Sequence, residues 1–419
     1  MEKVAVWDKF INLRYILPVL LGLGEEAVFH CGPQLASARP EALAGLKAAG
    51  VEVVVDDRQR AMSHKYYLMD SGHRLFMDLP ERAPGTEIIR QLETQGARFI
   101  FTAHGAEQAI NRHFTARDFF LAPSVAVLAD SVGAGKYLCD GEGRPLVGRS
   151  PKGTECAVAG LPYVTEEILA LKRRSREELK EELAERLKMK FDPALPLVFY
   201  MVPQRNAIPA TDRGLRRLAE RANVLVKNWL VRPIEGNYFN VRTEVAGPNI
   251  FQVGPGDYQD GDLTFLMRFA ADLNLVGLFS GSFITNVMIG LPTLPVYTRT
   301  IQAALPPRPF NYTVFLSNTT ELCVRLAHGL APMDIEATET IIERLDDKDY
   351  WERYENELPQ LRQLFLGDYQ LGREALDRTV FFIRRVLRVN SFNPSTLPPG
   401  GSIKDGPLRV GGGLCPIML

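Results

Sequence analysis

The sequence predicts an α/β fold of two domains, each with a parallel sheet covered by helices on both faces. The chain has 419 residues, more than one ordinary core fills, so two or three domains are expected. Short apolar runs alternate with polar helical stretches, and this alternation restarts directly after Asp192 and Pro193. Repeated strand-then-helix units are typical of parallel sheets, because parallel strands need a crossover connection.

The first predicted domain covers residues 1–165. Its expected strands are short apolar runs, at 26–31, 51–55 and 98–102. Its expected helices lie between such runs, at 41–49 and 88–94. Two further runs are candidates for short buried strands or helix starts, at 119–122 and 125–128. Residues 166–192 are expected to form a linker helix, whose clearest part, 168–190, ends in a charged run typical of a solvated face.

The second predicted domain covers residues 193–335. Its expected strands are again apolar runs, at 197–201, 224–227 and 250–253, with helical patterns at 211–222 and 263–271. Beyond it, residues 336–389 have the amphipathic pattern of helices that pack back on the domains. The Pro/Gly/Ser-rich segment 390–419 contains too few core residues to fold alone, so a flexible tail is expected.

The composition excludes several classes of protein. A formal net charge of −1 argues against a general nucleic-acid binder, which needs a basic surface. The longest apolar run, 15–23, is about half the length that spans a bilayer, and Glu2 and Asp8 do not fit the basic leader of a signal peptide. The five cysteines are scattered and form no CxxC pair, which favours reduced thiols in the cytoplasm and no metal site.

The segment 270–297 is the most informative part of the chain. It predicts a strand, a polar turn at Ser280, Gly281 and Ser282, a helix stopped by Gly290, and a second strand after Pro292. A Ser-Gly-Ser turn at a helix N-terminus offers free backbone N–H groups and hydroxyls to an anion, most often a phosphate. The alternative is an ordinary helix cap, because serine is a preferred N-cap residue.

Two further polar residues follow predicted strands. His104 comes just after the strand at 98–102, at the edge of the sheet where ligands bind in open α/β folds, and its pKa suits a general base. Arg205 comes just after the strand at 197–201, where its guanidinium is suited to a diphosphate. The alternatives are a hydrogen-bonded turn histidine and a surface salt bridge.

One tempting motif fails. Residues 130–136, DSVGAGK, look like a phosphate loop. The spacing of that loop requires glycine where Asp130 stands and serine or threonine where Tyr137 stands. We therefore do not predict a phosphate loop there.

Taken in order, these segments resemble the CDP-glycerol glycerophosphotransferase-like group of GT-B transferases. The family's Trp-His-Gly is similar to Ala103-His104-Gly105, and its Gly-x-Pro-Arg to Gly160-Leu161-Pro162, with Tyr163 in place of the arginine. Its strand ending Pro-Thr-x-Arg matches the segment that ends at Arg205, and its Ser-Asp-Tyr-Ser-Ser loop matches residues 277–281. The resemblance covers roughly residues 95–300.

The resemblance implies two Rossmann-like domains of GT-B type that face a cleft. The second domain would bind a CDP- or UDP-linked donor through a diphosphate-binding set of Arg205, Ser280, Gly281, Ser282 and Asn286. The first domain would bind the acceptor, and His104 would deprotonate its hydroxyl. No metal and no cofactor is expected, as is usual for GT-B transferases.

The implied function is transfer of a sugar or polyol-phosphate unit to a glycan or lipid-linked acceptor of the cell envelope or capsule. The expected location is the cytoplasm, with peripheral association at the inner face of the membrane left open. Two alternatives remain: a sugar-nucleotide epimerase of the same architecture, and a catalytically silent GT-B-like protein of binding or assembly. The donor base, the acceptor and the oligomeric state are also open.

Overall fold

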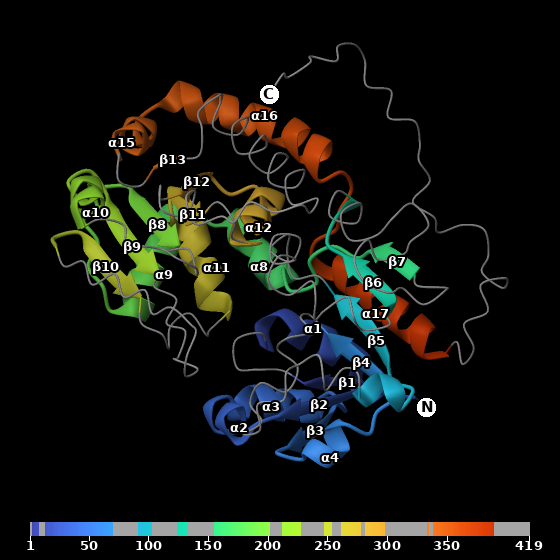
Figure 1. The fold of residues 1–419 in the computed structure, drawn as a ribbon. Helices are drawn as coiled ribbons and strands as arrows, with labels where there is room; N and C mark the ends of the chain where they lie inside the picture. Colours follow the sequence, from blue (N-terminus) through green and yellow to red (C-terminus); the bar gives the residue numbers. More distant parts are fainter. Residues whose placement is uncertain are drawn as a thin grey trace, which may run out of the picture.

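The structure, a computed structural model, describes eleven stretches of the chain: 2–7, 13–69, 91–102, 124–132, 155–201, 212–227, 247–253, 261–277, 281–297, 333–334 and 338–388. The strands in these stretches form two parallel sheets flanked by helices (Figure 1). This confirms the predicted α/β class with two sheets.

The first sheet has seven strands in the order β3-β2-β1-β4-β5-β6-β7, and every neighbouring pair is parallel. Its strands are β1 (Val4–Trp7), β2 (Ala27–Cys31), β3 (Glu52–Val55), β4 (Tyr66–Met69), β5 (Arg98–Thr102), β6 (Ser124–Ala129) and β7 (Glu155–Val158). Its helices are α1 (Leu13–Leu23), α2 (Pro33–Ala38), α3 (Pro40–Ala48) and α4 (Arg58–Ala61), with a 3₁₀ turn at Gly24–Glu26.

The second sheet has six strands in the order β10-β9-β8-β11-β12-β13, again all parallel. Its strands are β8 (Leu197–Met201), β9 (Asn223–Lys227), β10 (Ile250–Val253), β11 (Leu273–Gly277), β12 (Thr293–Tyr297) and β13 (Met333–Asp334). The helices between them are α10 (Asp212–Ala219), α11 (Gly261–Ala270) and α12 (Gly281–Ile289).

The strand order indicates at which point of each sheet a ligand is expected to bind. In both sheets the chain starts at a central strand, runs outward on one side and then crosses to the other. The order reverses between β1 and β4 in the first sheet and between β8 and β11 in the second. Ligands of open α/β sheets bind beyond the carboxyl ends of the strands at such a reversal.

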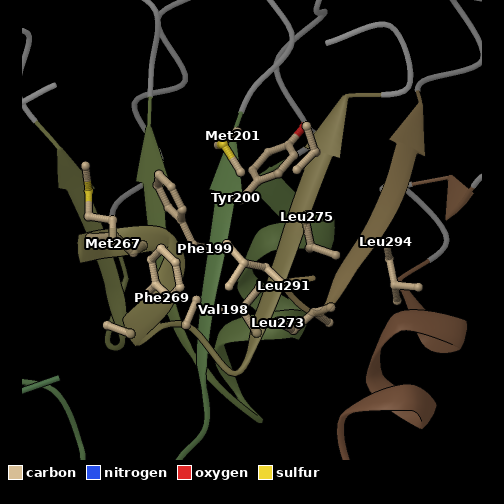
Figure 2. Close-up of a cluster of buried hydrophobic side chains, with 14 of the residues drawn as sticks. Val198, Phe199, Tyr200, Met201, Met267, Phe269, Leu273, Leu275, Leu291 and Leu294 are labelled. Atoms are coloured by element: carbon tan, nitrogen blue, oxygen red, sulfur yellow. The ribbon is translucent and has the colours of Figure 1, made fainter. Parts of the chain in front are cut away.

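The central strands are apolar because both of their faces are covered. Every residue of β8 is buried, and its side chains pack with those of α11, β11 and β12 (Figure 2). A continuous apolar run of this kind is typical of a parallel strand between two helical layers. A separate core fills the first sheet, between its strands and the helices α1, α3 and α17 (Gly372–Arg388).

The predicted helix at 168–190 is wrong in one respect, because it is broken. The chain forms α8 (Glu166–Ala170), a 3₁₀ turn at Leu171–Arg173 and then α9 (Arg176–Leu187). Ser175 restarts the helix with a capping box: its hydroxyl accepts from the Glu178 amide at 3.2 Å, and the Glu178 carboxylate accepts from the Ser175 amide at 3.1 Å. The charged residues are exposed as predicted, while Leu179 and Leu183 pack into the core of the second sheet.

The C-terminal helices contact both cores, as predicted. The helices α15 (Glu339–Leu345) and α16 (Lys348–Phe365) pack on the second sheet, where Tyr354 is fully buried. The helix α17 then packs against α1 on the first sheet (Figure 1). In the stretches that the structure describes, no helix combines the length and apolar character needed to cross a bilayer.

Candidate functional site

The segment after β11 has the predicted order of helix and strand, but the helix begins at Gly281, so two of the three residues predicted to form a turn lie in the helix. β11 leads to α12, and α12 leads to β12, which pairs with β11 in parallel. β11 also pairs with β8, so the N-terminus of α12 lies at the carboxyl edge of the second sheet, at the reversal of strand order. Gly281 and Ser282 are the first two residues of α12, and Ser280 lies outside the described residues. This is the edge where an α/β sheet binds its ligand.

A buried arginine joins α11 to the start of α12. Arg268 donates hydrogen bonds from Nη2 to Ser282 Oγ at 2.9 Å and from Nη1 to Asn286 Oδ1 at 3.2 Å. Its guanidinium also lies 4.9 Å from the ring centre of Phe265. The sequence analysis missed Arg268, because it stands alone in the apolar run 263–271 and has no motif around it.

Ser282 and Asn286, which were both predicted to bind a diphosphate, therefore share Arg268 as a hydrogen-bond donor. The acceptors of these two hydrogen bonds are neutral oxygens. Asn286 is fully buried, and its Nδ2 has no hydrogen-bond partner in the described part of the chain. The positive end of the α12 dipole adds to the charge of Arg268, so the start of α12 favours an anion.

A second buried cation stands at the same edge of the sheet. Lys227 is the last residue of β9, pairs in register with Met201 at the end of β8, and is fully buried. Arg205 follows Met201 by four residues and lies outside the described residues. Two buried basic side chains, Lys227 and Arg268, thus belong to the elements at the carboxyl edge around β8.

Tyr163 connects α12 to the segment that leads from the first sheet to the second. Its Oη lies 3.0 Å from Oγ1 of Thr285, one turn along α12 from Ser282. Burial raises the pKa of Tyr163, and the nearby Tyr15 raises it further, so the hydroxyl is neutral and able to donate or accept. Tyr163 therefore contacts α12.

On the first sheet, the predicted base His104 lies outside the described residues, two positions beyond the end of β5. A different ionisable residue stands at the end of the adjacent strand β6. Asp130 is 1% exposed, and neither of its carboxylate oxygens has a partner with hydrogen-bond geometry. Burial raises the pKa of Asp130 to about 6, against smaller lowering effects of its own amide and of Ser131.

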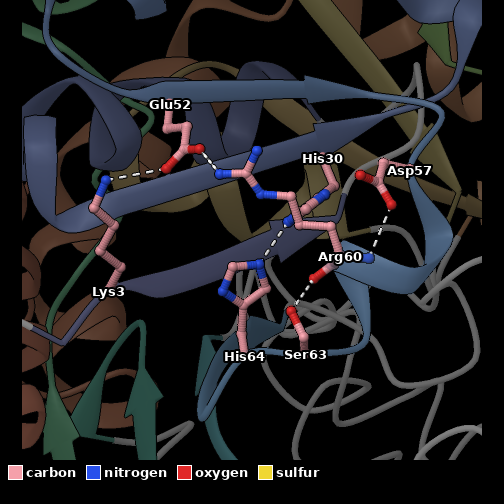
Figure 3. A network of polar contacts seen from close by, with 7 residues as sticks. All are labelled: Lys3, His30, Glu52, Asp57, Arg60, Ser63 and His64. Carbon is pink, nitrogen blue, oxygen red and sulfur yellow. Dashed lines mark hydrogen bonds and ion pairs between the residues drawn. The ribbon is translucent and has the colours of Figure 1, made fainter.

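A histidine pair lies on one face of the first sheet. Nε2 of His30 and Nε2 of His64 are 2.8 Å apart (Figure 3). His30 also stacks on Trp7, with ring centres 5.8 Å apart. Burial lowers the pKa of His30 to about 4, and the neighbouring His64 and Arg60 lower it further. Lys3 and Arg60 also flank the pair, and no described group of three or more His, Cys, Asp or Glu residues gathers as metal ligands do.

This protein is similar to known proteins in its three-dimensional structure. No protein-family model and no curated protein matches the sequence. Among solved structures, UDP-GlcNAc 2-epimerase from Neisseria meningitidis, bound to UDP-GlcNAc, superposes with a TM-score of 0.53 at 12% identity. UGT89C1 from Arabidopsis thaliana, complexed with UDP, superposes with a TM-score of 0.54 at 11% identity. Each match covers 92% of this chain and 100% of the other chain.

The chain has the GT-B fold. The match spans both sheets of the chain, so the GT-B assignment covers the whole architecture and is not limited to one Rossmann-like half. Within this fold, α12 is the helix that starts at the strand-order reversal of the second domain.

Proposed function

We propose that this GT-B protein is a nucleotide-sugar enzyme that transfers a sugar or polyol-phosphate unit from a nucleotide donor to a glycan or lipid-linked acceptor. The observation that carries the proposal is the buried guanidinium of Arg268, bonded to Ser282 and Asn286 at the N-terminus of α12. A diphosphate suits this site, because its negative charge and acceptor oxygens complement a guanidinium and a helix N-terminus.

Two of the similar structures contain a uridine nucleotide, which supports a nucleotide-linked sugar as the donor. UDP is therefore the first nucleotide to test, with CDP beside it because of the resemblance to CDP-glycerol transferases. Cell-envelope or capsular glycan remains the proposed acceptor class.

In the proposed mechanism, the second domain holds the donor. Ser280, Gly281 and Ser282 bind the diphosphate through backbone N–H groups and hydroxyls, and Arg205 and Asn286 complete the set. In transfer of a sugar, the bond from the sugar carbon to the diphosphate breaks and a nucleoside diphosphate leaves. In transfer of a polyol phosphate, the bridging P–O bond of the diphosphate breaks and a nucleoside monophosphate leaves. In both reactions negative charge grows on the leaving phosphate group. The N-terminus of α12 and the Arg268 guanidinium stabilise that charge where it develops.

The first domain then binds the acceptor and supplies the base. His104, just beyond β5, would remove the proton of the attacking hydroxyl, which then forms the new bond at the donor carbon or phosphorus. Neutral imidazole is required, so activity should fall as the pH drops through the pKa of His104.

A thermal-shift screen with UDP, CDP, GDP and CMP tests the first step. A nucleotide that binds the native state alone raises the melting temperature. Failure of all four to bind would contradict the proposal. Incubation with UDP-GlcNAc then separates the candidates: release of UDP on addition of an acceptor supports a transferase, a changed sugar on intact donor supports the epimerase, and binding without turnover supports the silent protein.

A further inference from the structure

Two chain segments connect the sheets, and they lie side by side. Residues 159–164 lead from the first sheet to the second, and residues 366–372 return from α16 to α17. The amide of Leu161 donates to the Gln370 carbonyl at 3.0 Å, and the amide of Gly372 donates to the Val164 carbonyl at 2.8 Å. We call these two paired segments the strap.

The strap is closely fitted. Gly160 has φ +87° and Gly372 has φ +63°, a region that L side chains rarely adopt. A side chain at Gly160 would overlap the backbone of Gln370, and one at Gly372 would overlap the Glu166 carboxylate. The same carboxylate accepts from the Arg373 amide at 2.9 Å. The strap therefore has one favoured arrangement, in which its two segments are in register.

Both segments of the strap hold α12. Tyr163, on the outgoing segment, bonds Thr285 at 3.0 Å. Tyr369, on the returning segment, donates to the Met288 carbonyl at 3.0 Å, and Arg362 donates to the same carbonyl at 3.3 Å. The helix at whose N-terminus the candidate site lies is thus attached to the strap along its length.

The strap is also attached to the carboxyl end of β6. The amide of Ala159 donates to the Ala129 carbonyl at 2.8 Å, and the amide of Val132 donates to the Asp368 carbonyl at 3.0 Å. Asp130 lies between these two attachment points in the sequence, and its buried carboxylate makes no hydrogen bond of normal geometry in the described part of the chain.

Among the described residues, Asp130 interacts electrostatically with Tyr163 of the strap, and Tyr163 interacts in turn with Tyr15 of α1 and Arg268 of α11. The pKa of Tyr163 is raised mainly by its burial. Tyr15, of α1, meets the Tyr163 ring edge-on with centres 4.7 Å apart. Tyr163 stays neutral near pH 7, so Asp130 is the group among them whose charge changes in the weakly acidic range.

We propose that Asp130 makes the strap a pH-sensitive coupling between the two domains: ionisation of its buried carboxylate loosens the strap and the hold of the strap on α12. A neutral carboxyl group tolerates burial beside the attachment points of the strap. Burial of the carboxylate there is costly, and the nearby amide and Ser131 offset only part of that cost. Opening of the strap admits water to the carboxylate and removes that cost. This inference concerns the fold and holds whether or not the proposed function is correct.

Hydrogen exchange of the strap amides tests this inference directly. In the wild type, protection at Leu161 and Gly372, corrected for the intrinsic pH dependence of exchange, should fall about tenfold or more from pH 5 to pH 8, because the Asp130 pKa lies inside that range. The amide of Asp272, which donates to the Leu197 carbonyl at 2.8 Å within the second domain, is the internal control and should not follow.

Asp130→Asn keeps the size of the side chain and removes its charge, so the strap protection of this variant should be the same at both pH values. Wild-type strap protection that does not depend on pH, or an unchanged pH response in Asp130→Asn, would overturn the proposal.

A double variant, Tyr163→Phe with Tyr369→Phe, tests the link to α12. Protection of the Gly290 amide, which closes α12, should follow the strap in the wild type and not in the double variant. A Gly290 response that is the same in both proteins would contradict the coupling.

Discussion

Arg268 Nη2 lies 2.9 Å from Ser282 Oγ, and this bond fixes the first turn of α12 against α11. The second bond of the same guanidinium, to Asn286 one turn further along α12, prevents the helix from rotating about the first. Both of these acceptors are neutral side chains. In the proposed enzyme, the guanidinium also contacts the donor diphosphate.

Replacing this guanidinium should weaken nucleotide binding. In Arg268→Met, which keeps an apolar chain of similar length, the dissociation constant for UDP should rise about tenfold to a hundredfold, the scale of 1.5–3 kcal/mol for hydrogen bonds to a charged group. Isothermal titration calorimetry measures this change. The matched control is Arg221→Met, because Arg221 is an exposed arginine of the same domain that pairs with Asp346 at 2.5 Å. Equal affinity of the two variants for UDP would mean that Arg268 only stabilises the packing of α11 and α12.

The strap glycine Gly160 should be intolerant of any side chain. Gly160→Ala would require a left-handed backbone at φ +87° and an overlap with Gln370, so the free energy of unfolding should fall by about 3 kcal/mol. Urea unfolding followed by circular dichroism measures it. Gly45→Ala is the matched control: Gly45 lies inside α3 with nothing within 4 Å of an added Cβ, so alanine should stabilise by up to about 1 kcal/mol. A Gly160→Ala variant that is as stable as the wild type would contradict the assigned fit.

The predicted base His104 is tested by kinetics, since it lies outside the described residues. In His104→Ala, turnover should fall by a factor on the order of 10²–10⁴ with little change in nucleotide affinity, because a general base acts in the transition state. Steady-state kinetics beside calorimetry separates the two effects. Full activity in His104→Ala would favour a binding protein.

Much of the fold was predictable because it follows from apolar patterns. The bounds of β8 and β10 agree with the predicted strands, and β2 and β5 differ by at most one residue. Three strands of the first sheet, β1, β4 and β7, were missed. Each has four residues, but so do β3 and β10, which were predicted, so strand length alone does not explain the missed strands.

The break before α9 and the role of Arg268 were both missed in the prediction from sequence, for different reasons. The break was readable in principle, because Ser175 and Glu178 have the spacing of a capping box. Arg268 was not readable, because its partners Ser282 and Asn286 come close to it through the crossing of α11 and α12, which no local pattern encodes. The same holds for Asp130, whose importance comes from its burial under the strap.

The histidine pair should make the first domain sensitive to acid. The pKa of His30 in the folded protein is about 4, below its ordinary value of 6.5, so the unfolded chain binds more protons between these values. The stabilisation is complete above pH 6.5 and is lost as the pH falls toward 4, by roughly 3 kcal/mol. Urea unfolding at pH 7.5 and 4.5 should show a smaller difference in His30→Phe, which keeps an aromatic ring against Trp7. An unchanged difference would exclude His30 as the source.

Asp130 should act in the opposite direction. Its pKa is raised in the folded protein from 3.8 to about 6, so the folded chain binds more protons than the unfolded chain between these values. Stability is therefore highest below pH 3.8, as far as this group is concerned, and declines as the pH rises through 6, by roughly 3 kcal/mol. Asp130→Asn has no such decline, so the variant should be more stable than the wild type at pH 8 and nearly equal to it at pH 4. Urea unfolding at the two pH values, with exposed Asp346→Asn as the control, measures this difference. A variant that is less stable than the wild type at pH 8 would mean that the carboxylate has a stabilising partner, and that the strap closes on an ionised Asp130.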